Sequence, residues 1–411
     1  MNSLTPRDAH ALMEKVVAQA TGEEITILDT STFTSVGEKL LRTGTENTLN
    51  AISTVLAKTI FSVRPYKSRF SSLEVSPERW GAQIRKIITL YVESEASTDY
   101  NTESNPDTLA DGASVDMYKI KTPKAVQLNF WGTQKLQKHI TIFRDQLALA
   151  FSNENEFNRF VSAVMVQFAN EIELLNEAKS RATLLNFMAG ISSMGLTEVD
   201  LTAEYNTANG TTLTRDQLLS AEHLENFMKF VASTIKIYSE RLVDMSALNH
   251  AQITGQNKIL RHTPKGRQKM WMYNPVFIKT QATVYSSIFN PQYLDIGKFE
   301  GVNYWQSQTN PEEIKVTPNI LDVSTGNSKT AETAVELPFV LGLLADEEAV
   351  GVLPQFDYAS TTPFNSAGGY YNNFMHWRFN SYNDFTENAV LFVMGAGGAA
   401  EGGAAEGGET A

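Results

Sequence analysis

The longest helical pattern in the chain is residues 153–190, which read NENEFNRFVSAVMVQFANEIELLNEAKSRATLLNFMAG. Apolar residues recur there mostly at steps of three or four, which places their side chains on one helix face. This stripe comprises Phe157, Phe160, Val161, Val164, Phe168, Ile172, Leu175, Ala178, Ala182 and Leu185. Asn153 can cap the first turn together with Glu156, and Gly190 is a stop signal. We therefore predict one helix over about 153–189, about 55 Å long at ~1.5 Å per residue.

A helix of this length is about three times as long as the usual one. It would be either part of a coiled coil or a single helix that packs along a sheet. The apolar steps follow a period of about 3.6 rather than a strict heptad, and the stripe is rich in aromatic side chains. Both features favour a single long helix packed on a sheet.

The composition is that of a folded protein, with 411 residues, 42% of them hydrophobic, and no cysteine. This length is enough for roughly two or three domain-sized units. The lack of cysteine excludes disulfides, Cys-ligated zinc, iron–sulfur clusters and thiol nucleophiles. Lys and Arg number 34 against 46 Asp and Glu, a net charge of -12. Affinity for nucleic acid rests on Lys and Arg. We therefore do not expect DNA or RNA to cover most of the surface of this acidic protein.

The N-terminal residues predict an arm rather than a targeting segment. The first eight residues lack the apolar core of a signal peptide, and no apolar run reaches the ~18 residues of a membrane span. We therefore expect a soluble protein made in the cytoplasm, without a membrane partner. Residues 5–8 form a helix start that Gly22 can end, residues 25–33 are extended, and a second helix begins at Thr45. Such small elements over residues 1–61 suggest an arm laid on something else.

Residues 62–131 predict a long β-hairpin. Residues 85–92 read as one strand, and the apolar residues of 115–120 and 126–130 suggest further strand on the return. The polar tract 94–114 lies between them and is longer than the loops that globular domains usually keep.

Charge is segregated along this hairpin. Six basic residues lie between 64 and 86 against two acids, and seven acids lie between 93 and 116 with no base. They are Arg64, Lys67, Arg69, Arg79, Arg85 and Lys86, and Glu93, Glu95, Asp99, Glu103, Asp107, Asp111 and Asp116. Exposed charge runs are often only solvated loops. The alternative is that these residues are inter-subunit contacts, in which opposite patches on neighbouring copies fix the register.

After the long helix the pattern alternates between helix and strand. We predict a loop over 195–214, a helix over 220–242, a strand over 269–273, a helix start at Asn274 and a second strand over 302–305. This stretch, about 200–335, behaves as a small domain of its own. Between 245 and 294 it has six basic residues and no acid, namely Lys258, Arg261, Lys265, Arg267, Lys269 and Lys279. Such a cluster is a local candidate site for a phosphate or an acidic neighbour.

The last part of the chain predicts a strand over 338–344, an acidic turn over 346–350, and a final hairpin of strands 374–382 and 388–394. Residues 395–411 contain almost only Gly, Ala and Glu, which predicts a disordered acidic tail. Residues 395–400 match G-x-G-x-x-A, the dinucleotide-binding pattern. We reject this match because the residues after it are too few and too rich in glycine for the required helix and strand.

The search for chemistry is otherwise empty. Six histidines are scattered without metal-binding spacing, and no nucleophile elbow or phosphate-binding loop occurs. We therefore predict no catalytic residue, no cofactor and no metal site. Carboxylates are plentiful, so a glycosidase-type pair stays open. An arm, a long charged hairpin and a long helix together favour a protein whose function is self-assembly.

Three C-terminal segments carry a family resemblance: LADEEAV at 344–350, GYYNNFMHWRF at 369–379 and NAVLFVMG at 388–395. They resemble the closing segment of the small short-tailed podovirus capsid proteins. The order of parts along about 1–395 is similar to tailed-bacteriophage major capsid proteins of the HK-ninety-seven type, an α+β fold. The resemblance implies an N-terminal arm (1–61), an extended β-hairpin loop (62–131), a peripheral domain with the spine helix (132–199), an axial domain (200–335), return strands of both domains (336–394) and a tail (395–411).

The resemblance also implies a function and partners. Copies of the chain would form the hexamers and pentamers of an icosahedral shell that encloses double-stranded DNA without sequence-specific binding. The shell would assemble in the host bacterial cytoplasm with a portal protein. A separate scaffolding protein is implied because the chain has no long charged N-terminal extension. Some relatives cross-link through a lysine of the extended loop, near which Lys119, Lys121 and Lys124 lie. The alternatives are an encapsulin-type compartment shell and a carboxylate-based enzyme such as a glycoside hydrolase.

Overall fold

The protein was analysed as a computed structural model, whose described residues are 6–21, 27, 35–37, 70–75, 84–92, 112, 114, 116–118, 120–122, 124–130, 133–143, 154–253, 258–276, 278 and 298–397. The chain divides into two compact units. Unit 1 comprises 1–79, 132–183 and 351–382, and unit 2 comprises 80–131, 184–350 and 383–411.

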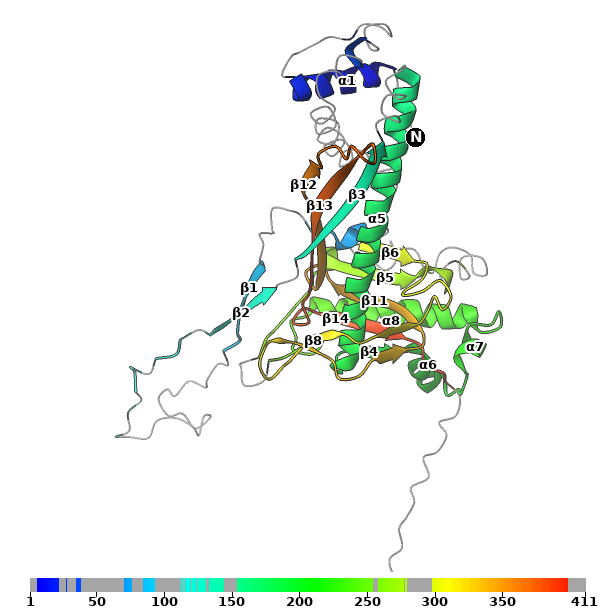
Figure 1. The fold of residues 1–411 in the computed structure, drawn as a ribbon. Coiled ribbons are helices and arrows are strands. Elements are labelled where there is room, and N and C mark those ends of the chain that lie inside the picture. Colours follow the sequence, from blue (N-terminus) through cyan, green and yellow to red (C-terminus); the bar gives the residue numbers. More distant parts are fainter. Residues whose placement is uncertain are drawn as a thin grey trace, which may run out of the picture. The chain divides into compact units, whose positions relative to one another are not determined.

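Unit 1 is built around a three-stranded sheet of order β12-β13-β3. Its elements are α1 (Pro6–Thr21), η1 (Ser71–Leu73), β3 (Gln134–Phe143), the first part of α5 (Glu154–Ser193), β12 (Val350–Thr361) and β13 (Tyr370–Asn383). Along β13 the odd-numbered residues from Tyr371 to Phe379 are buried and the even-numbered ones are half-buried, as expected for a strand with one covered face. β3 runs beside α5, and Lys138 of β3 pairs with Glu171 of α5 (Figure 1).

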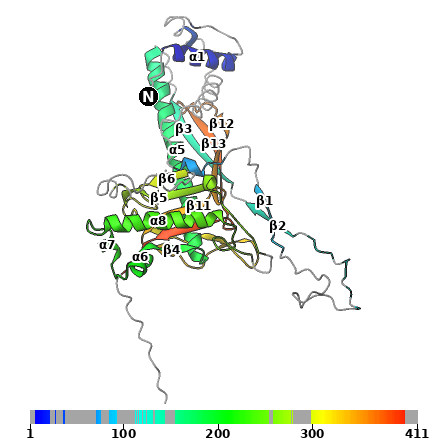
Figure 2. The same cartoon turned by 180° about the vertical axis from the view of Figure 1, so that it is seen from behind.

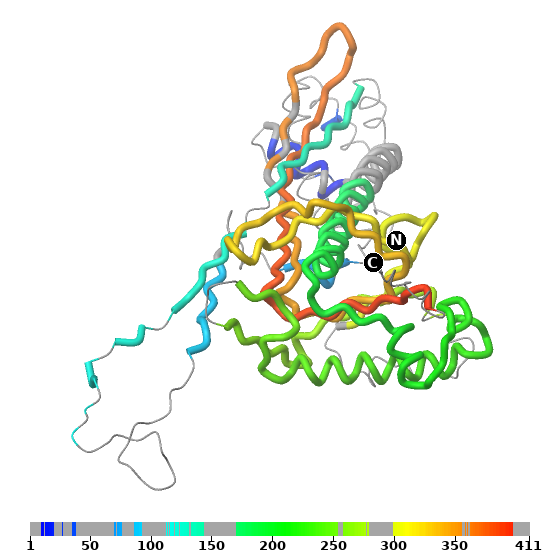
Figure 3. Tube along the Cα trace, turned by 90° about the horizontal axis from the view of Figure 1, so that it is seen from below, coloured from blue at the N-terminus to red at the C-terminus, as the bar shows by residue number. Residues whose placement is uncertain are grey.

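Unit 2 contains a mixed five-stranded sheet of order β4-β14-β11-β5-β6. The strands are β4 (Glu198–Asp200), β5 (Gln268–Tyr273), β6 (Lys298–Val302), β11 (Val340–Asp346) and β14 (Ala389–Val393). β5, β11 and β14 are buried on both faces. Helix α8 (Leu224–Val243) crosses one face of this sheet (Figure 2), where Tyr238 makes an edge-on contact with Phe392. Seen from below, β14 lies between α8 and the end of α5 (Figure 3).

The remaining elements of unit 2 are short. Antiparallel pairs are formed by β1 with β2, β7 with β10 and β8 with β9. Their bounds are β1 (Ile84–Thr89), β2 (Ala125–Phe130), β7 (Ile314–Val316), β8 (Asn319–Leu321), β9 (Ser328–Thr330) and β10 (Val335–Leu337). The other helices are α6 (Leu201–Asn209), α7 (Arg215–Leu218) and the turn η3 (Lys265–Arg267).

The long helix is confirmed, but Gly190 does not end it. α5 continues to Ser193, and a Cβ at position 190 would overlap the buried ring of Phe385. The stop is Gly195, which has a φ of 62°. Its N–H donates to Ser192 O, and Leu196 N–H donates to Ile191 O. This is a Schellman end, which requires the left-handed conformation that glycine adopts most readily. Gly190 is therefore a packing residue of the helix.

The loop predicted over 195–214 is wrong, because it contains β4 and α6. Asp200 caps α6, since its side chain accepts from Thr202 N–H and Ala203 N–H. Gly210, at a φ of 64°, ends the helix. These are ordinary start and stop signals for a nine-residue helix, within a stretch whose polar composition alone suggests a loop.

The final hairpin is also wrong. The two predicted strands exist as β13 and β14, but they belong to different sheets. β13 pairs with β3, whereas β14 pairs with β11 and β4. The residues between them, 384–388, are buried rather than forming an exposed turn. Their backbone bonds to other segments, for example from Asp384 N–H to Ala349 O, carry the chain from one sheet to the other.

Two further strand predictions differ from the structure. The strand expected over 115–120 is absent among the described residues of that stretch. Instead Met117 and Tyr118 form a turn in which the Asp116 carboxylate accepts from Tyr118 N–H at 2.9 Å. The strand expected over 302–305 is β6, which ends at Val302. Trp305 lies beyond it, where its indole N–H donates to Val340 O at 2.8 Å.

Other predicted elements are confirmed with small shifts in their ends. They are the helix at residue 6 (α1), the helix of 220–242 (α8), the strands of 85–92 (β1), 269–273 (β5) and 338–344 (β11), and the acidic turn after β11. The strands β3, β4, β7, β8, β9, β10 and β12 were not predicted. The helix expected from Thr45, the Asn153 cap and the 398–411 part of the tail lie outside the described residues. Among the described residues, every helix is too short or too polar to cross a membrane.

Candidate functional site

The base of the β1–β2 hairpin has one face turned toward the rest of unit 2 and one turned to solvent. The antiparallel register places Ile88 opposite Val126 and Lys86 opposite Leu128. Because side chains alternate along a strand, Lys86, Ile88 and Leu90 share the inner face. Ile88 and Leu90 are buried, whereas Ile87 is 69% exposed.

Apolar contacts hold the inner face. Ile88, Leu90 and Leu128 form a cluster with Ile253 and Ile259, residues of the loop that follows α8. Each such buried side chain stabilises the contact by about 1.5–3 kcal/mol relative to an exposed one. The backbone adds a bond from Tyr91 N–H to Lys258 O at 3.0 Å. The base of the hairpin is thus fixed to the rest of unit 2.

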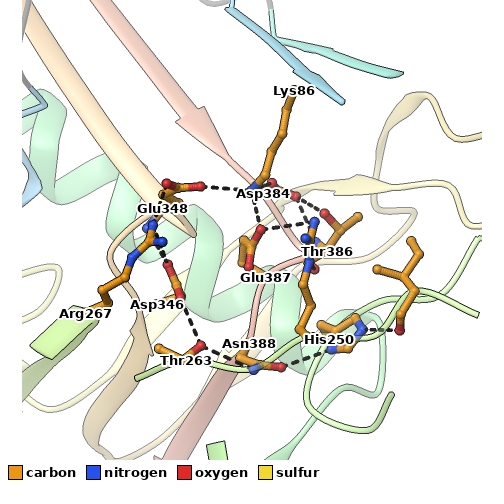
Figure 4. A network of polar contacts seen from close by, with 12 residues as sticks. Lys86, His250, Thr263, Arg267, Asp346, Glu348, Asp384, Thr386, Glu387 and Asn388 are labelled. Carbon is orange, nitrogen blue, oxygen red and sulfur yellow. Dashed lines mark hydrogen bonds and ion pairs between the residues drawn. The ribbon is translucent and has the colours of Figure 1, made fainter. Parts of the chain in front are cut away.

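A buried charged cluster lies beside this apolar contact (Figure 4). The Lys86 ammonium lies 2.7 Å from Asp384 Oδ2, and it also pairs with Glu387. Glu348 Oε2 is 3.6 Å away. Asp384 is 1% exposed and Glu387 6%. On the other side, Arg261 Nη2 lies 3.1 Å from Glu387 Oε1.

Two buried acids, Asp384 and Glu387, therefore lie against the Lys86 ammonium, and their negative charge favours its protonated form. Burial alone would lower the pKa of Lys86, but the Asp384 and Glu387 carboxylates outweigh it and raise that pKa above 10.5. Burial raises the pKa of Glu387 above 4.5, with Asp384 adding to the effect and with Lys86 and Arg261 opposing it. Lys86 is thus protonated and positively charged at neutral pH.

The acids are held by a rigid local structure. Asp384 Oδ1 accepts from Thr386 N–H at 2.9 Å and from Thr386 Oγ1–H at 2.6 Å, which leaves Oδ2 for Lys86. Ala251 N–H donates to Phe385 O at 2.7 Å, and Asp346 N–H donates to Asn388 O at 2.9 Å. The segment 384–388 is therefore fixed by bonds that do not involve the hairpin.

A chain of hydrogen bonds continues from this segment through buried side chains. Thr263 Oγ1–H donates to Asp346 Oδ2 at 2.9 Å, and Asn388 Nδ2–H donates to Thr263 Oγ1 at 3.2 Å. The Asn388 oxygen then faces His250 Nδ1 at 3.0 Å, so that nitrogen is the donor. Because a carboxylate only accepts, the direction of the whole chain is set by Asp346.

The basic stretch 258–279 does not form a free anion site among its described residues. Arg267 pairs with Glu347 and Glu348 of the acidic turn, with Arg267 Nε 2.9 Å from Glu347 Oε1. Lys265 pairs with Glu240, and Arg261 pairs with Glu387. The acidic neighbour expected from the sequence is therefore supplied by the chain itself. Lys279 lies outside the described residues.

The solvent side of the hairpin exposes large apolar side chains. Ile87 is 69% exposed, and the described part of the hairpin beyond the strands exposes Met117 by 81%, Tyr118 by 79% and Ile120 by 85%. Tyr91 is also exposed, by 44%. Apolar groups gathered on one projecting segment are typical of a surface that contacts a partner.

Of the thirteen charged residues considered as inter-subunit contacts, few have described positions. Lys86 lies in the charged cluster of its own chain, and Asp116 is exposed. Arg85 lies in β1, without a described side chain. The others lie outside the described residues, namely Arg64, Lys67, Arg69, Arg79, Glu93, Glu95, Asp99, Glu103, Asp107 and Asp111. No sequence pattern predicts the Lys86 cluster, because its acids lie 298 and 301 residues away along the chain.

The charged side chains of this cluster are paired with one another. The buried acids are paired with Lys86 and Arg261. Within the part of the chain that the structure describes, no group of three or more His, Asp or Glu side chains is placed to hold a metal ion. The features that stand out are an anchored hairpin base and an exposed apolar surface beyond it.

Known phage structures resemble this chain in fold. No sequence among the curated proteins matches the chain. The capsid structure of Staphylococcus phage Andhra is similar in fold, with a TM-score of 0.53 at 9% identity, over 81% of this chain and 86% of that one. A chain from a structure of the head fiber and inner core protein gp22 of native bacteriophage P68 gives a TM-score of 0.49 at 11% identity, over 79% of this chain and 84% of that one.

The family comparison goes further than the fold. The model of the Phi29-like phage major capsid protein family matches residues 11–393, nearly the whole chain. This match favours neither an encapsulin-type compartment nor a glycoside hydrolase. The chain belongs to the family of Phi29-like phage major capsid proteins.

Proposed function

We propose that copies of this chain form the hexamers and pentamers of an icosahedral shell around the double-stranded DNA of a tailed phage, with the β1–β2 hairpin lying on a neighbouring copy. The observation that carries the proposal is the division of the hairpin into two surfaces. Its inner face is fixed to its own unit by Ile88 and Lys86, while Met117 and Ile120 are more than four-fifths exposed, at 81% and 85%. An isolated subunit gains nothing from this exposure, whereas contact with a second copy would remove it from water.

The charged residues of the hairpin would determine how it is oriented on the neighbouring copy. We propose that the acids of 93–116, with Asp116 at their end, lie on the basic residues Arg64, Lys67, Arg69, Arg79 and Arg85 of the adjacent subunit. Opposite charges on repeated surfaces fix the register of each contact, and a closed shell repeats the contact many times. Lys86 is not included, because its charge is neutralised within its own chain.

The partners follow from the same proposal. A shell that closes around DNA needs a vertex through which DNA enters, so a portal protein is expected, and a separate scaffolding protein would guide closure. Assembly would take place in the cytoplasm of the host bacterium, and the chain would have no enzymatic role. The enclosed DNA would be held without sequence-specific contacts.

Electron microscopy and the native mass of the purified protein, with and without a scaffolding protein, test the proposal. The wild type should give closed shells with masses in megadaltons. The variant Met117→Ser with Ile120→Ser should remain subunits or small oligomers, because the contact loses its apolar part, with circular dichroism unchanged. Leu248→Ser is the matched control, since Leu248 is equally exposed, at 80%, but belongs to the loop after α8 and not to the hairpin.

The same assembly assay can be repeated at different salt concentrations. Raised ionic strength screens exposed charges beyond about 10 Å at ~0.1 M, so it should lower the yield of shells. A wild type that stays monomeric with scaffold present would overturn the proposal. Shells from the Met117 and Ile120 variant in wild-type yield would overturn the role of the hairpin.

A further inference from the structure

The Lys86 cluster combines a rigid acidic partner with a basic group on the hairpin. The acids are fixed before the hairpin is considered, because Asp384 is bonded to Thr386 and Ala349 and Glu387 is paired with Arg261. Lys86 is the member that belongs to β1. The cluster therefore constrains the position of the hairpin base.

We propose that Lys86 is the positioning residue of the hairpin, and that its bonds to Asp384 and Glu387 set the register and direction in which β1 and β2 leave unit 2. This inference rests on the proposed function, since the position matters because the hairpin then meets a neighbouring copy. Nothing in the proposal requires Lys86 to touch that copy.

The chemistry of position 86 supports a directional role. Alternation along β1 makes residue 86 an inner-face position like 88 and 90, where an apolar side chain would bury more surface. Apolar contacts of Ile88 and Leu90 with Ile253 and Ile259 keep this face of the strand buried, but such contacts are non-directional and do not set the exact angle of the strand. An ammonium between two fixed carboxylates has one favourable place. A slip of one residue would turn Lys86 to solvent and leave the buried acids with too little positive charge.

The same argument explains why the anchor is a lysine that is mostly covered. Its side chain is 19% exposed, and the Asp384 side chain is 1% exposed. Breaking a buried pair leaves an uncompensated charge, which costs far more than losing an exposed pair. Moving the hairpin base away from this position would therefore be energetically costly.

The test is hydrogen exchange on unassembled subunits, followed by assembly. In Lys86→Met, which keeps the apolar stem, the amides of Ile84–Thr89 and Ala125–Phe130 should exchange about tenfold faster or more. Exchange in the strands β5, β11 and β14 should stay close to wild type. Lys86→Arg should restore slow exchange, and Lys124→Met is the matched control at an exposed lysine of the same hairpin.

Assembly distinguishes positioning from simple stability. Lys86→Met should give open or irregular particles in place of closed shells. Adding Asp384→Asn neutralises the buried carboxylate that Lys86 pairs with and keeps an oxygen for Thr386, so it should recover stability to unfolding, yet the double variant should still fail to close shells. Closed wild-type shells from Lys86→Met, or equally faster exchange throughout unit 2, would overturn the proposal. If the wild type itself never assembles, the proposed function fails, and the exchange experiment still decides whether Lys86 anchors the hairpin.

Discussion

The hydrogen bonds around His250 set the form of the imidazole that the folded protein prefers. Nδ1 donates to Asn388 Oδ1, and Gln252 Nε2–H reaches His250 Nε2 at 2.8 Å. Ile259 O also lies 2.9 Å from Nε2 and would favour a second proton there. Burial outweighs this acceptor and lowers the pKa of His250 below 6.5. The neutral ring with its proton on Nδ1 is therefore the form that completes the chain to Asp346.

This geometry predicts a pH dependence. A folded-state pKa below the unfolded value means that His250 adds its full stability above about pH 6.5. That stability is lost as the pH falls from there through the lowered pKa. The free energy of unfolding in urea, measured for wild type and His250→Gln from pH 7.5 to 5, should show the advantage of the wild type shrinking on acidification. An advantage that is constant or grows would contradict the assigned form.

Single residues also show where sequence reasoning reaches its limit. The run of bases between 245 and 294 was visible, but its partners were not, because Arg261 pairs with Glu387 and Arg267 with Glu347. Charge runs report composition, whereas pairing depends on which segments the fold brings together. Lys86 is the clearest example. Its place in an apolar alternation is readable from the sequence, but the acids that bind it come from the other end of the chain.

At the scale of elements, the period of the apolar stripe predicted α5 and α8 well, since a helix needs only local information. The ends and pairings of elements were less predictable. Gly190 and Gly195 are both plausible stops for α5, and only the backbone shows that Gly195 has the positive φ. Strands β13 and β14 read as a hairpin because they are adjacent in sequence. Asp384 and Thr386 between them are typical turn residues, and only the structure shows that both are buried, where a hairpin turn would expose them.

The role of Gly190 inside α5 gives a prediction at this scale. Gly190→Ala should lower the free energy of unfolding by about 1–3 kcal/mol, the usual cost of overpacking a core. The added Cβ would overlap the Phe385 ring, which is stacked on Phe187 with centroids 5.1 Å apart. This loss should appear even though alanine favours helix over glycine by about 1 kcal/mol. Urea unfolding measures it.

The matched control for this prediction is Gly266→Ala. A Cβ at Gly266 meets nothing within 4 Å, so the change should stay within about 0.5 kcal/mol. If Gly190→Ala were as stable as the wild type or more so, the glycine at position 190 would not be needed for packing against Phe385.

At the scale of the whole molecule, the net charge of -12 takes on a different meaning once the chain is a capsid protein. An acidic balance first argued against nucleic acid as a partner. A shell that encloses DNA benefits from a surface to which phosphates do not adhere, because the genome must move freely during entry and exit. Several bases that could have bound phosphate are neutralised internally, among them Arg261, Lys265 and Arg267.

Free subunits should therefore bind duplex DNA weakly and only at low salt. Fluorescence anisotropy with a labelled duplex should give a dissociation constant no tighter than about 100 µM at ~0.15 M salt, the weak end of non-specific binding. Glu347→Gln with Glu348→Gln removes the two closest acidic partners of Arg267 and leaves only Asp346 at 4.0 Å, so binding should tighten and the slope of log K against log salt should steepen by up to about one phosphate contact. Glu222→Gln with Asp244→Asn is the control with the same change of charge at exposed acids elsewhere, and it should leave the slope near that of the wild type. Submicromolar binding by the wild type at this salt would contradict a shell that encloses its genome without gripping it, since each subunit would then hold DNA in place.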